Sequence, residues 1–370
     1  MSARIAAASS PGEIRVAAVE GNELLDYAIW RPGAPDGVGD LHRGRVIARV
    51  PAMAGCFVAL DGAEGFLPDS QGGAEATEGD TLGVRITRAA QGGKGPRLSA
   101  RLEATDRAGV GAGPPALLRR GPGGVERLAR LYPDAAIVVD DAALAASLRA
   151  SLGGRVSVAG RVFDDPLETE IEALARPTVE LPGGGRLHIH PTPALVAIDL
   201  DSGAATAERR GKTAVQIEFN RTALSVLARQ IRLRNLSGAI LVDFAGLSVR
   251  RRTALRPHFA AALAQDPLCP RLLGFTGLGL AEVLRPRVHP PLHELLVGPH
   301  AAGLVALRRI AADLAAGPSQ LPVLRAIPAI VAALQADPVA LPDLAQRAGR
   351  PLMLRSDPTV AGFTLEMPDA

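Results

Sequence analysis

AIDLDSG (residues 197–203) and AILVDF (residues 239–244) each continue an apolar run into aspartate. Short runs rich in Ile, Leu and Val predict buried strands, and here Asp199, Asp201 and Asp243 interrupt them. An unpaired carboxylate costs several kcal/mol to bury, so acids inside strands need a partner. A divalent cation beside phosphate is one such partner. The two stretches therefore indicate strands that carry nuclease chemistry.

The spacing of these acids permits a metal site. Asp199 and Asp201 lie two residues apart, so on a strand their side chains share one face. With Asp243 on a second strand, three carboxylates could meet at a shared sheet edge. Mg²⁺ typically binds one or two carboxylates together with substrate phosphate and water. The alternative, acids that cap turns at strand ends, stays open on spacing alone. A calcium loop is excluded, because Gly203 stands fifth rather than sixth and Arg210 occupies the place of the twelfth-position Glu.

Composition sets broad bounds on the class of protein. The 370 residues allow two or three domains with an ample core. Only Lys94 and Lys212 are lysines, and the formal net charge is +3, so overall charge argues only weakly for nucleic acid. Cys56 and Cys269 lack CxxC spacing, which argues against structural zinc and a disulfide framework. Without a long apolar run or a signal-peptide core, we expect no membrane span and a cytoplasmic location.

The apolar pattern changes along the chain. Residues 14–30 (IRVAAVEGNELLDYAIW) predict a hairpin, and five short strands with Gly turns in residues 41–102 favour a small barrel, with an OB-fold as the leading candidate. In residues 117–175 helices and strands alternate, which is α/β patterning. Further strands and helices follow, including a helix that ends at Arg234. From about Gly298 the tail predicts helices and two short strands.

Two other motifs have competing interpretations. RRGKT (residues 209–213) resembles the end of a phosphate-binding P-loop, but Thr206 stands where the first Gly is required, so that motif is rejected. Lys212 remains either a phosphate contact or a solvated charge. His188 and His190 alternate on one predicted strand, which permits metal binding. No third ligand is spaced nearby, so ordinary exposed histidines are the simpler interpretation.

The predicted barrel holds candidate RNA contacts. Phe57 and Phe66 stand out because aromatic residues make up only 3% of the chain. Exposed on an OB-fold, they would stack bases at about 1–3 kcal/mol each, whereas the alternative places both in the core. GGKG (residues 92–95) holds Lys94 in a loop where Gly permits close backbone approach to phosphate.

Several stretches, in chain order, resemble the ribonuclease E/G family. VELPGGGRLHIHPTPALVAIDLDSG (residues 179–203) is similar to the start of its catalytic region, and ARQIRLRNLSGAILVDF (residues 228–244) to its most distinctive signature. GDLHRGRVIARV, CFVALDGAEGFLP and GGKGPRLS resemble its OB-fold RNA-binding domain. EIRVAAVEGNELLDYAIWRPG resembles its opening hairpin, so the resemblance covers nearly the whole chain.

The resemblance implies a Mg²⁺-dependent endoribonuclease that cuts single-stranded RNA, as in rRNA processing or mRNA decay, and leaves a 5′-phosphate and a 3′-hydroxyl. Asp199 and Asp243 match the two carboxylates that hold the ion, for which Mn²⁺ is a possible substitute. Asp201 falls where the family usually has Asn, which assists those carboxylates, and a third acid there could still serve the ion, so we expect Asp201 as a third catalytic residue. The matches to RNA-contacting positions of the OB-fold are Phe57, Phe66, Arg88 and Lys94, and Lys212 is one more candidate contact.

The resemblance also implies an architecture. It is an RNase H-like fold interrupted by an OB-fold β-barrel, followed by a DNase I-like catalytic subdomain and a small C-terminal α/β domain. The overall class is α/β in the multidomain, α+β sense. We expect these domains, in that order, at residues 1–36 with 104–178, at 37–103, at 179–297 and at 298–370.

The chain departs from the family pattern in its accessory parts. The segment that senses a 5′-monophosphate is replaced by a short connector between Leu102 and Arg119, so we expect no 5′-end sensing. The CPxC zinc link is absent near residues 289–303, which predicts no zinc and no zinc-linked tetramer, but a dimer or a monomer. Gly277 replaces a family Arg and Leu60 a family aromatic, which predicts altered substrate choice.

The main hypothesis is therefore an endoribonuclease with single-stranded RNA as its partner and no membrane association. The second is a catalytically weak or inactive RNA-binding factor, such as an rRNA-maturation factor on the same fold. The third is a DNA nuclease with a similar acidic site.

Overall fold

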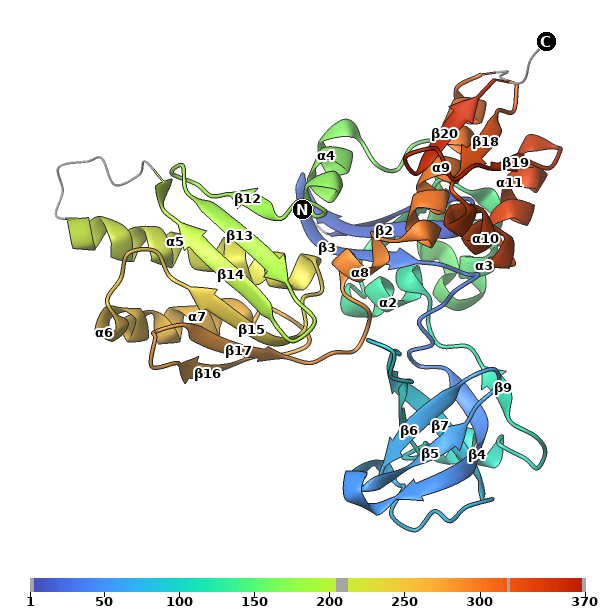
Figure 1. The fold of residues 1–370 in the computed structure, drawn as a ribbon, viewed down its shortest axis with the longest axis horizontal. Helices are drawn as coiled ribbons and strands as arrows, with labels where there is room; N and C mark the ends of the chain where they lie inside the picture. The colour runs from blue at the N-terminus through green and yellow to red at the C-terminus, as the bar shows by residue number, and fades with distance from the viewer. Residues whose placement is uncertain (1–2, 204–211, 318–319, 368–370) are drawn as a thin grey trace.

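The computed structural model describes residues 3–203, 212–317 and 320–367, and these form four adjoining units (Figure 1). We call them the N-terminal unit, the barrel, the six-stranded unit and the C-terminal unit. The mixed α/β class is confirmed. Within the described residues, no helix is long and apolar enough to cross a membrane.

The N-terminal unit is a five-stranded sheet in the order β11-β10-β1-β2-β3. Its elements are β1 (Arg4–Ser10), β2 (Glu13–Glu20), β3 (Glu23–Trp30), α2 (Gly124–Leu131), β10 (Ala136–Val139), α3 (Ala142–Leu152), η3 (Gly153–Arg155), β11 (Val156–Val158) and α4 (Asp165–Ala173). The β2–β3 pairing confirms the predicted hairpin. Strand β1 was not predicted. Ile5 packs on the side of α2 and Ala6 on the side of α4, and burial on both faces removes the alternation that marks a strand.

The barrel is inserted between β3 and α2. Its elements are β4 (Leu41–Val50), η1 (Pro51–Met53), β5 (Gly55–Ala59), β6 (Glu64–Pro68), η2 (Asp69–Gln71), β7 (Thr81–Arg88) and β8 (Arg97–Ser99). The β4–β5 pairing closes the sheet, which confirms the predicted five-stranded, OB-like barrel. In the expected connector, α1 (Ala104–Ala108) is followed by β9 (Ala116–Arg119), which pairs with β4. Where the chain enters and leaves, Asp40 accepts hydrogen bonds from Arg120 (2.5 Å) and from the Gly121 amide (2.6 Å).

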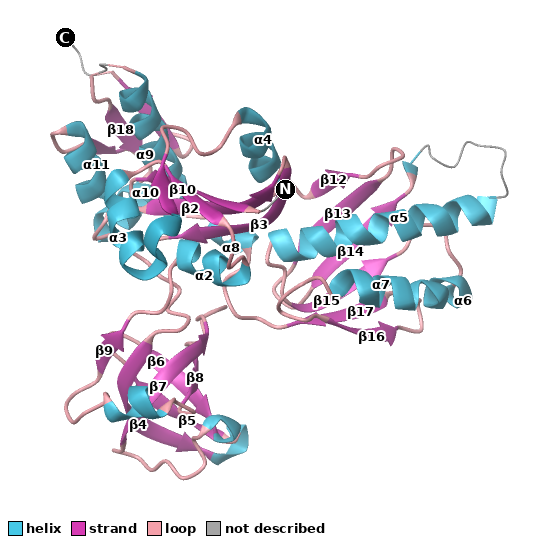
Figure 2. Ribbon diagram, turned by 180° about the vertical axis from the view of Figure 1, so that it is seen from behind, coloured by secondary structure: helices cyan, strands magenta, loops and turns pink. Residues whose placement is uncertain are grey.

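The six-stranded unit has the strand order β12-β13-β14-β15-β17-β16. Its elements are β12 (Thr178–Glu180), β13 (Arg186–Pro191), β14 (Val196–Asp201), α5 (Lys212–Leu233), β15 (Gly238–Asp243), α6 (Val249–Arg252), η5 (Thr253–Leu255), α7 (Arg256–Leu263), β16 (Arg271–Phe275) and β17 (Ala281–Arg285). Helices α5 and α7 lie side by side over one face of this sheet (Figure 2). The opposite face carries no helix of this unit, and we call it the open face.

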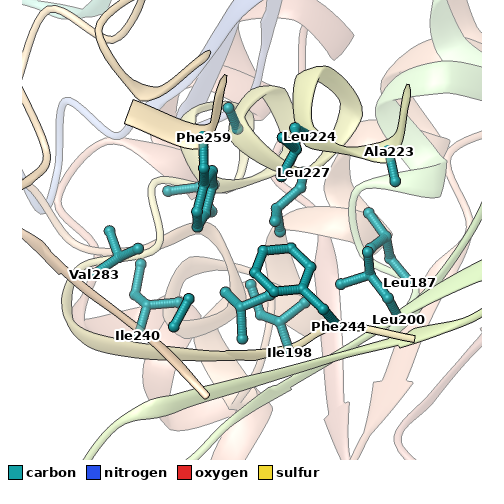
Figure 3. Close-up of a cluster of buried hydrophobic side chains, with 14 of the residues drawn as sticks. Leu187, Ile198, Leu200, Ala223, Leu224, Leu227, Ile240, Phe244, Phe259 and Val283 are labelled. Atoms are coloured by element: carbon teal, nitrogen blue, oxygen red, sulfur yellow. The ribbon is translucent and has the colours of Figure 1, made fainter. Parts of the chain in front are cut away.

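The core of this unit lies between the sheet and the two helices (Figure 3). Leu224, Leu227 and Ile231 recur at the spacing that places apolar side chains on one helix face, and they are buried against the strands. Helix α5 ends before Asn235, which adopts a left-handed conformation with φ +49°. This turn directs the chain into β15 beside β14.

The C-terminal unit packs three helices on a small sheet of order β19-β18-β20. Its elements, with the short helix that precedes them, are α8 (Leu292–Leu295), α9 (Pro299–Ala316), β18 (Val323–Ala326), α10 (Pro328–Ala336), α11 (Ala340–Ala348), β19 (Met353–Ser356) and β20 (Phe363–Glu366). The tail thus has three strands rather than the two predicted.

Candidate active site

Asp199 and Asp243 lie directly beside each other on neighbouring parallel strands. The register of β14 and β15 pairs the two residues as Cα partners. On each strand the adjacent residues, Ile198 and Val242, are buried under the helices. Because side chains alternate along a strand, both aspartates point to the open face. The structure therefore brings together the two acids that head the sequence prediction.

The two aspartates are exposed to solvent, whereas the sequence predicted that they would be buried. Asp199 is exposed and the side chain of Asp243 is 48% exposed. They sit on the solvent side of the sheet, so neither pays the desolvation cost that applies in a core. The inference that they need a partner because they are buried was wrong. Their placement side by side on an accessible surface is what makes them a candidate site.

Arg252 is a residue that sequence reasoning missed. It donates from Nη1 to Asp243 Oδ1 at 2.5 Å. Its own side chain is mostly buried and also donates to the carbonyls of Leu247 and Gly279. The arginine run at residues 250–252 was the available signal, but nothing in the sequence shows which of its members turns back toward Asp243.

Asp201 lies one step further along the open face. It pairs with Arg186 on β13 and is exposed. Its Oδ1 accepts a hydrogen bond from the Gly203 amide at 2.9 Å. β15 ends at Asp243, opposite Asp199, so Asp201 extends beyond the pair. Asp201 is therefore a neighbour of the Asp199–Asp243 pair, and its Oδ1 already accepts the hydrogen bond from Gly203.

His188 is the Cα partner of Asp199 on the other side of β14. Thr178 Oγ1 lies 3.2 Å from its Nδ1. The rings of His188 and His190 are stacked, with centroids 6.4 Å apart. Within the described residues, no group of three or more His, Cys, Asp or Glu side chains is arranged to hold a metal ion. The simpler interpretation of these histidines is thus consistent with the geometry, although the proximity of His188 to Asp199 was not foreseen.

The aspartate pair fits Mg²⁺ in number and chemistry. Mg²⁺ prefers oxygen ligands and usually takes one or two carboxylates, with water and substrate phosphate completing the octahedron. Asp199 and Asp243 offer oxygens from two rigid strands, and their exposure leaves room for the remaining ligands. A two-carboxylate site needs no third protein ligand, so the absence of a larger cluster in the described residues does not conflict with it.

Comparisons with known proteins find a family that resembles the region around the two acids. Residues 145–288, which contain β12 to β17 and both aspartates, match the profile of the ribonuclease E/G family. This region of the chain is therefore similar to the ribonuclease E/G family. The profile match begins within α3 and leaves the barrel outside it.

Individual ribonucleases E and G match the same region. The chain is 38% identical to ribonuclease E of Nostoc sp. over 130 residues, which are 35% of this chain and 19% of that protein. It is 37% identical to ribonuclease E of Escherichia coli over 131 residues, or 35% of this chain and 12% of that protein. The match to ribonuclease G of Escherichia coli is 34% over 137 residues, or 36% and 27%. The matched stretch is therefore less than a third of the length of each relative named here.

The other predicted contacts of the chain lie away from the acids, mostly on the barrel. Phe57 and Phe66 are partners on β5 and β6, with ring centroids 5.5 Å apart. Both rings are half-buried, while their neighbours Cys56 and Leu67 fill the interior. The two phenylalanines thus face outward, and the core alternative was wrong. Lys94 is exposed on the tight turn that Gln91 and Lys94 close through their backbones.

Two further predicted contacts remain. Arg88 ends β7 beside Arg97 of β8, next to the row of the two phenylalanines. Lys212 is the first residue of α5, and its side chain lies outside the described part of the structure.

Proposed function

We propose that this chain is a divalent-metal-dependent endoribonuclease that cuts single-stranded RNA. The observation that carries the proposal is the in-register pairing of Asp199 and Asp243 on an accessible sheet face, within a region that matches the profile of the ribonuclease E/G family. Within the described residues, Asp199 forms no ion pair, and Asp243 pairs with Arg252 through Oδ1 alone. Two such adjacent carboxylates are suited to a divalent ion and a phosphodiester. The full activity is a proposal, because the match spans a minor part of each relative.

In this proposal Asp199 and Asp243 hold Mg²⁺, with Mn²⁺ as a substitute. When bound, the ion supplies charge neutralisation at the phosphate and lowers the pKa of attacking water. Arg252 orients the Asp243 carboxylate through Oδ1 and leaves Oδ2 for the ion. Asp201, one step along the strand, has no hydrogen bond at Oδ2 from the part of the chain that the structure describes, so this oxygen can bind water or a ribose hydroxyl. The products are a 5′-phosphate and a 3′-hydroxyl.

The barrel is proposed to hold the RNA strand. Phe57 and Phe66 expose parts of their rings for base stacking, and Lys94 and Arg88 supply charge for phosphate. Lys212 is a further proposed contact. The finer architecture also stays a proposal. The N-terminal unit corresponds to an RNase H-like fold (residues 1–36 with 104–178), the barrel to residues 37–103, the six-stranded unit to a DNase I-like subdomain (179–297), and the C-terminal unit to residues 298–370.

The experiment that tests the function is cleavage of an end-labelled, single-stranded RNA by the full chain. We expect internal cuts in Mg²⁺ or Mn²⁺, none in EDTA, and none with Asp243→Asn, whose melting temperature should stay near that of the parent. Asp313→Asn, an exposed acid on α9, is the matched control and should keep full activity. Absence of cleavage by the parent in both ions, with either a 5′-hydroxyl or a 5′-monophosphate, would reject the enzyme.

A second candidate function is RNA binding without turnover, as in an rRNA-maturation factor. Gly277, in the loop beside Asp243, favours it because this position matches a family Arg. The test is a binding titration with the same end-labelled RNA, together with the cleavage assay. RNA binding that Asp199→Asn and Asp243→Asn leave unchanged, with no products in either ion, would support this function instead. For either function we propose a cytoplasmic protein acting in rRNA processing or mRNA decay, as a monomer or dimer without a zinc link.

A further inference from the structure

A cavity of about 440 Å³ lies between the barrel and the end of the six-stranded sheet, and arginines dominate its lining. Arg88 comes from the end of β7, Arg271 from β16 and Arg287 from the chain that follows β17. We call these three side chains the arginine groove. No acidic residue is among the described residues that line this cavity. The fourth arginine there, Arg285, is already neutralised by Asp266 at 2.7 Å, with both side chains buried.

The arginines of the groove lack counterions. None of Arg88, Arg271 and Arg287 forms an ion pair with any described residue. The Nε of Arg88 is buried without a hydrogen-bond partner. Burial and the charges of Arg97 and Arg287 lower the pKa of Arg88 from its usual value. Like charges gathered in a partly desolvated cleft repel one another, so this arrangement favours a bound polyanion.

The groove is held in place by backbone contacts. Gly238, at the start of β15, has no side chain, and a Cβ there would lie 2.6 Å from Nε of Arg287. Just past β7, the Ala89 amide donates to the carbonyl of Val288 at 2.9 Å. The Gln91 side chain donates to the carbonyl of His289 at 3.2 Å. These bonds fix the end of the barrel that carries Arg88 against the segment that carries Arg287.

The groove joins two surfaces already assigned to RNA. On the barrel, the strand register runs from Phe57 to Phe66, then to Arg97 and Arg88. On the sheet, Arg271 is the partner of Leu284, on the same open face as Asp243. The length of β15, from Gly238 to Asp243, separates the groove from the acids by about 17 Å. That span is about five stacked nucleotides at ~3.4 Å each.

On this basis, and given the proposed function, we propose that the arginine groove binds the phosphate backbone of single-stranded RNA and connects the barrel to the catalytic acids. The site is electrostatic and sequence-independent. It contributes to RNA binding only where the strand is long enough to run from the acids to the barrel. A short RNA that covers only the acids gains nothing from it.

The test measures binding rather than cleavage, in the full chain carrying Asp243→Asn and without divalent metal. Labelled oligouridylates are titrated at several salt concentrations, one of about two nucleotides, too short to run from the acids to the groove, and one long enough to reach the barrel. Arg271→Gln combined with Arg287→Gln is compared with Arg149→Gln combined with Arg350→Gln. The second pair removes the same charge from exposed arginines on α3 and after α11.

We expect the groove variant to bind the long RNA at least about tenfold more weakly than the control variant. Its salt dependence should fall by about 0.7 in log–log slope for each phosphate that the variant no longer neutralises. Equal affinities and equal slopes for the two variants would overturn the proposal that the groove binds RNA. The proposed nuclease activity would not be affected by that result. A failure of the Asp243→Asn chain to bind the long RNA would overturn the groove as an RNA site, whereas the nuclease is rejected only by absence of cleavage with the parent chain. Because Arg271 is exposed, Arg271→Gln alone checks that weaker binding does not come from misfolding.

Discussion

Arg252 donates to Asp243 across 2.5 Å and is itself held by the carbonyls of Leu247 and Gly279. Asp243 keeps one carboxylate oxygen for a ligand and commits the other to a protein cation. The two carbonyls come from the segment after β15 and from the β16–β17 connection. Arg252 therefore links both sides of the site and is a positioning residue for the carboxylate.

Replacing this fork of donors should damage both activity and stability. Arg252→Lys keeps the charge, but a single ammonium group cannot serve three acceptors in the guanidinium geometry. We expect kcat to fall about tenfold and the free energy of unfolding to fall by about 1–3 kcal/mol. Arg250→Lys, an exposed neighbour, is the control. Steady-state cleavage with denaturant unfolding measures both quantities, and equal kcat values for the two variants would contradict a positioning role.

The negative charge of Asp201 should not be needed for RNA cleavage. It lies beyond the Asp199–Asp243 pair and already accepts a hydrogen bond from Gly203. Asp201→Asn preserves that acceptor and the size of the side chain. We expect it to keep kcat within about threefold, which is below about 0.7 kcal/mol. Asp201→Ala, which removes the acceptor, should be worse. A loss of activity with Asp201→Asn as complete as that with Asp243→Asn would instead indicate a three-carboxylate site.

Sequence alone identifies the acids but not their alignment. Period-two alternation shows that Asp199 and Asp201 share a face, yet it cannot tell which strands are neighbours. The pairing of Asp199 with Asp243 depends on the parallel register that α5 creates by crossing the sheet. Arg252 reaches Asp243 only because the chain turns back after β15, and such tertiary contacts leave no periodic signal.

The barrel was predicted from the sequence, whereas strand β1 was not, and the exposure of their strands explains the difference. Five strands with Gly turns were enough to predict a closed barrel, because those strands have one buried and one exposed face. Strand β1 is covered on both faces and built largely of Ala, so neither alternation nor propensity marks it. The outward direction of Phe57 and Phe66 follows from register against Cys56 and Leu67, which only the structure supplies.

Gly277 offers a gain-of-function test. A Cβ at this position meets no atom within 4 Å, so a side chain is accommodated without a clash. The residue lies in the connection between β16 and β17, whose Gly279 carbonyl contacts Arg252. Gly277→Arg adds a cation to the connection that contacts Arg252, and we expect kcat/KM for RNA to rise about threefold or more. Gly277→Ala is the control and should show no rise. An unchanged or lower kcat/KM in the arginine variant would contradict a missing contact here.

Phe57 should contribute to RNA affinity rather than to the barrel core. Base stacking on an aromatic ring is worth about 1–3 kcal/mol, so Phe57→Ala should weaken RNA binding by about five- to 150-fold. Its edge contact with Phe66 predicts a decrease of only about 1 kcal/mol in stability. Met53→Ala, at an exposed apolar residue of the same barrel, is the control. Equal RNA affinities of the two variants, measured by fluorescence anisotropy, would remove Phe57 from the binding surface.

The junction between the units contains a partly buried histidine that predicts sensitivity to mild acid. His289 Nδ1 lies 2.6 Å from Asp36 Oδ2 and 2.9 Å from Arg127 Nη1. Burial lowers the pKa of His289 below its usual 6.5, and the charges of Arg127 and Arg285 act in the same direction, outweighing Asp36. Burial alone would raise the pKa of Asp36, but the hydrogen bond and charge of His289 and the charge of Arg127 lower it on balance.

Both groups therefore stabilise the fold in their deprotonated forms. A pKa depressed on folding gives a contribution that is present above the unfolded pKa and is lost as pH falls through the folded pKa. For His289 the loss of stability begins below about pH 6.5, whereas for Asp36 it begins only below about pH 3.8. The melting temperature should thus fall between about pH 7 and about pH 5, a window in which His42 and His293, whose pKa values burial also lowers, act in the same direction. His289→Gln, which cannot take up a proton, should flatten this part of the profile, and His190→Gln, at an exposed site, should not. Parallel profiles for the two variants would assign the acid sensitivity to another group.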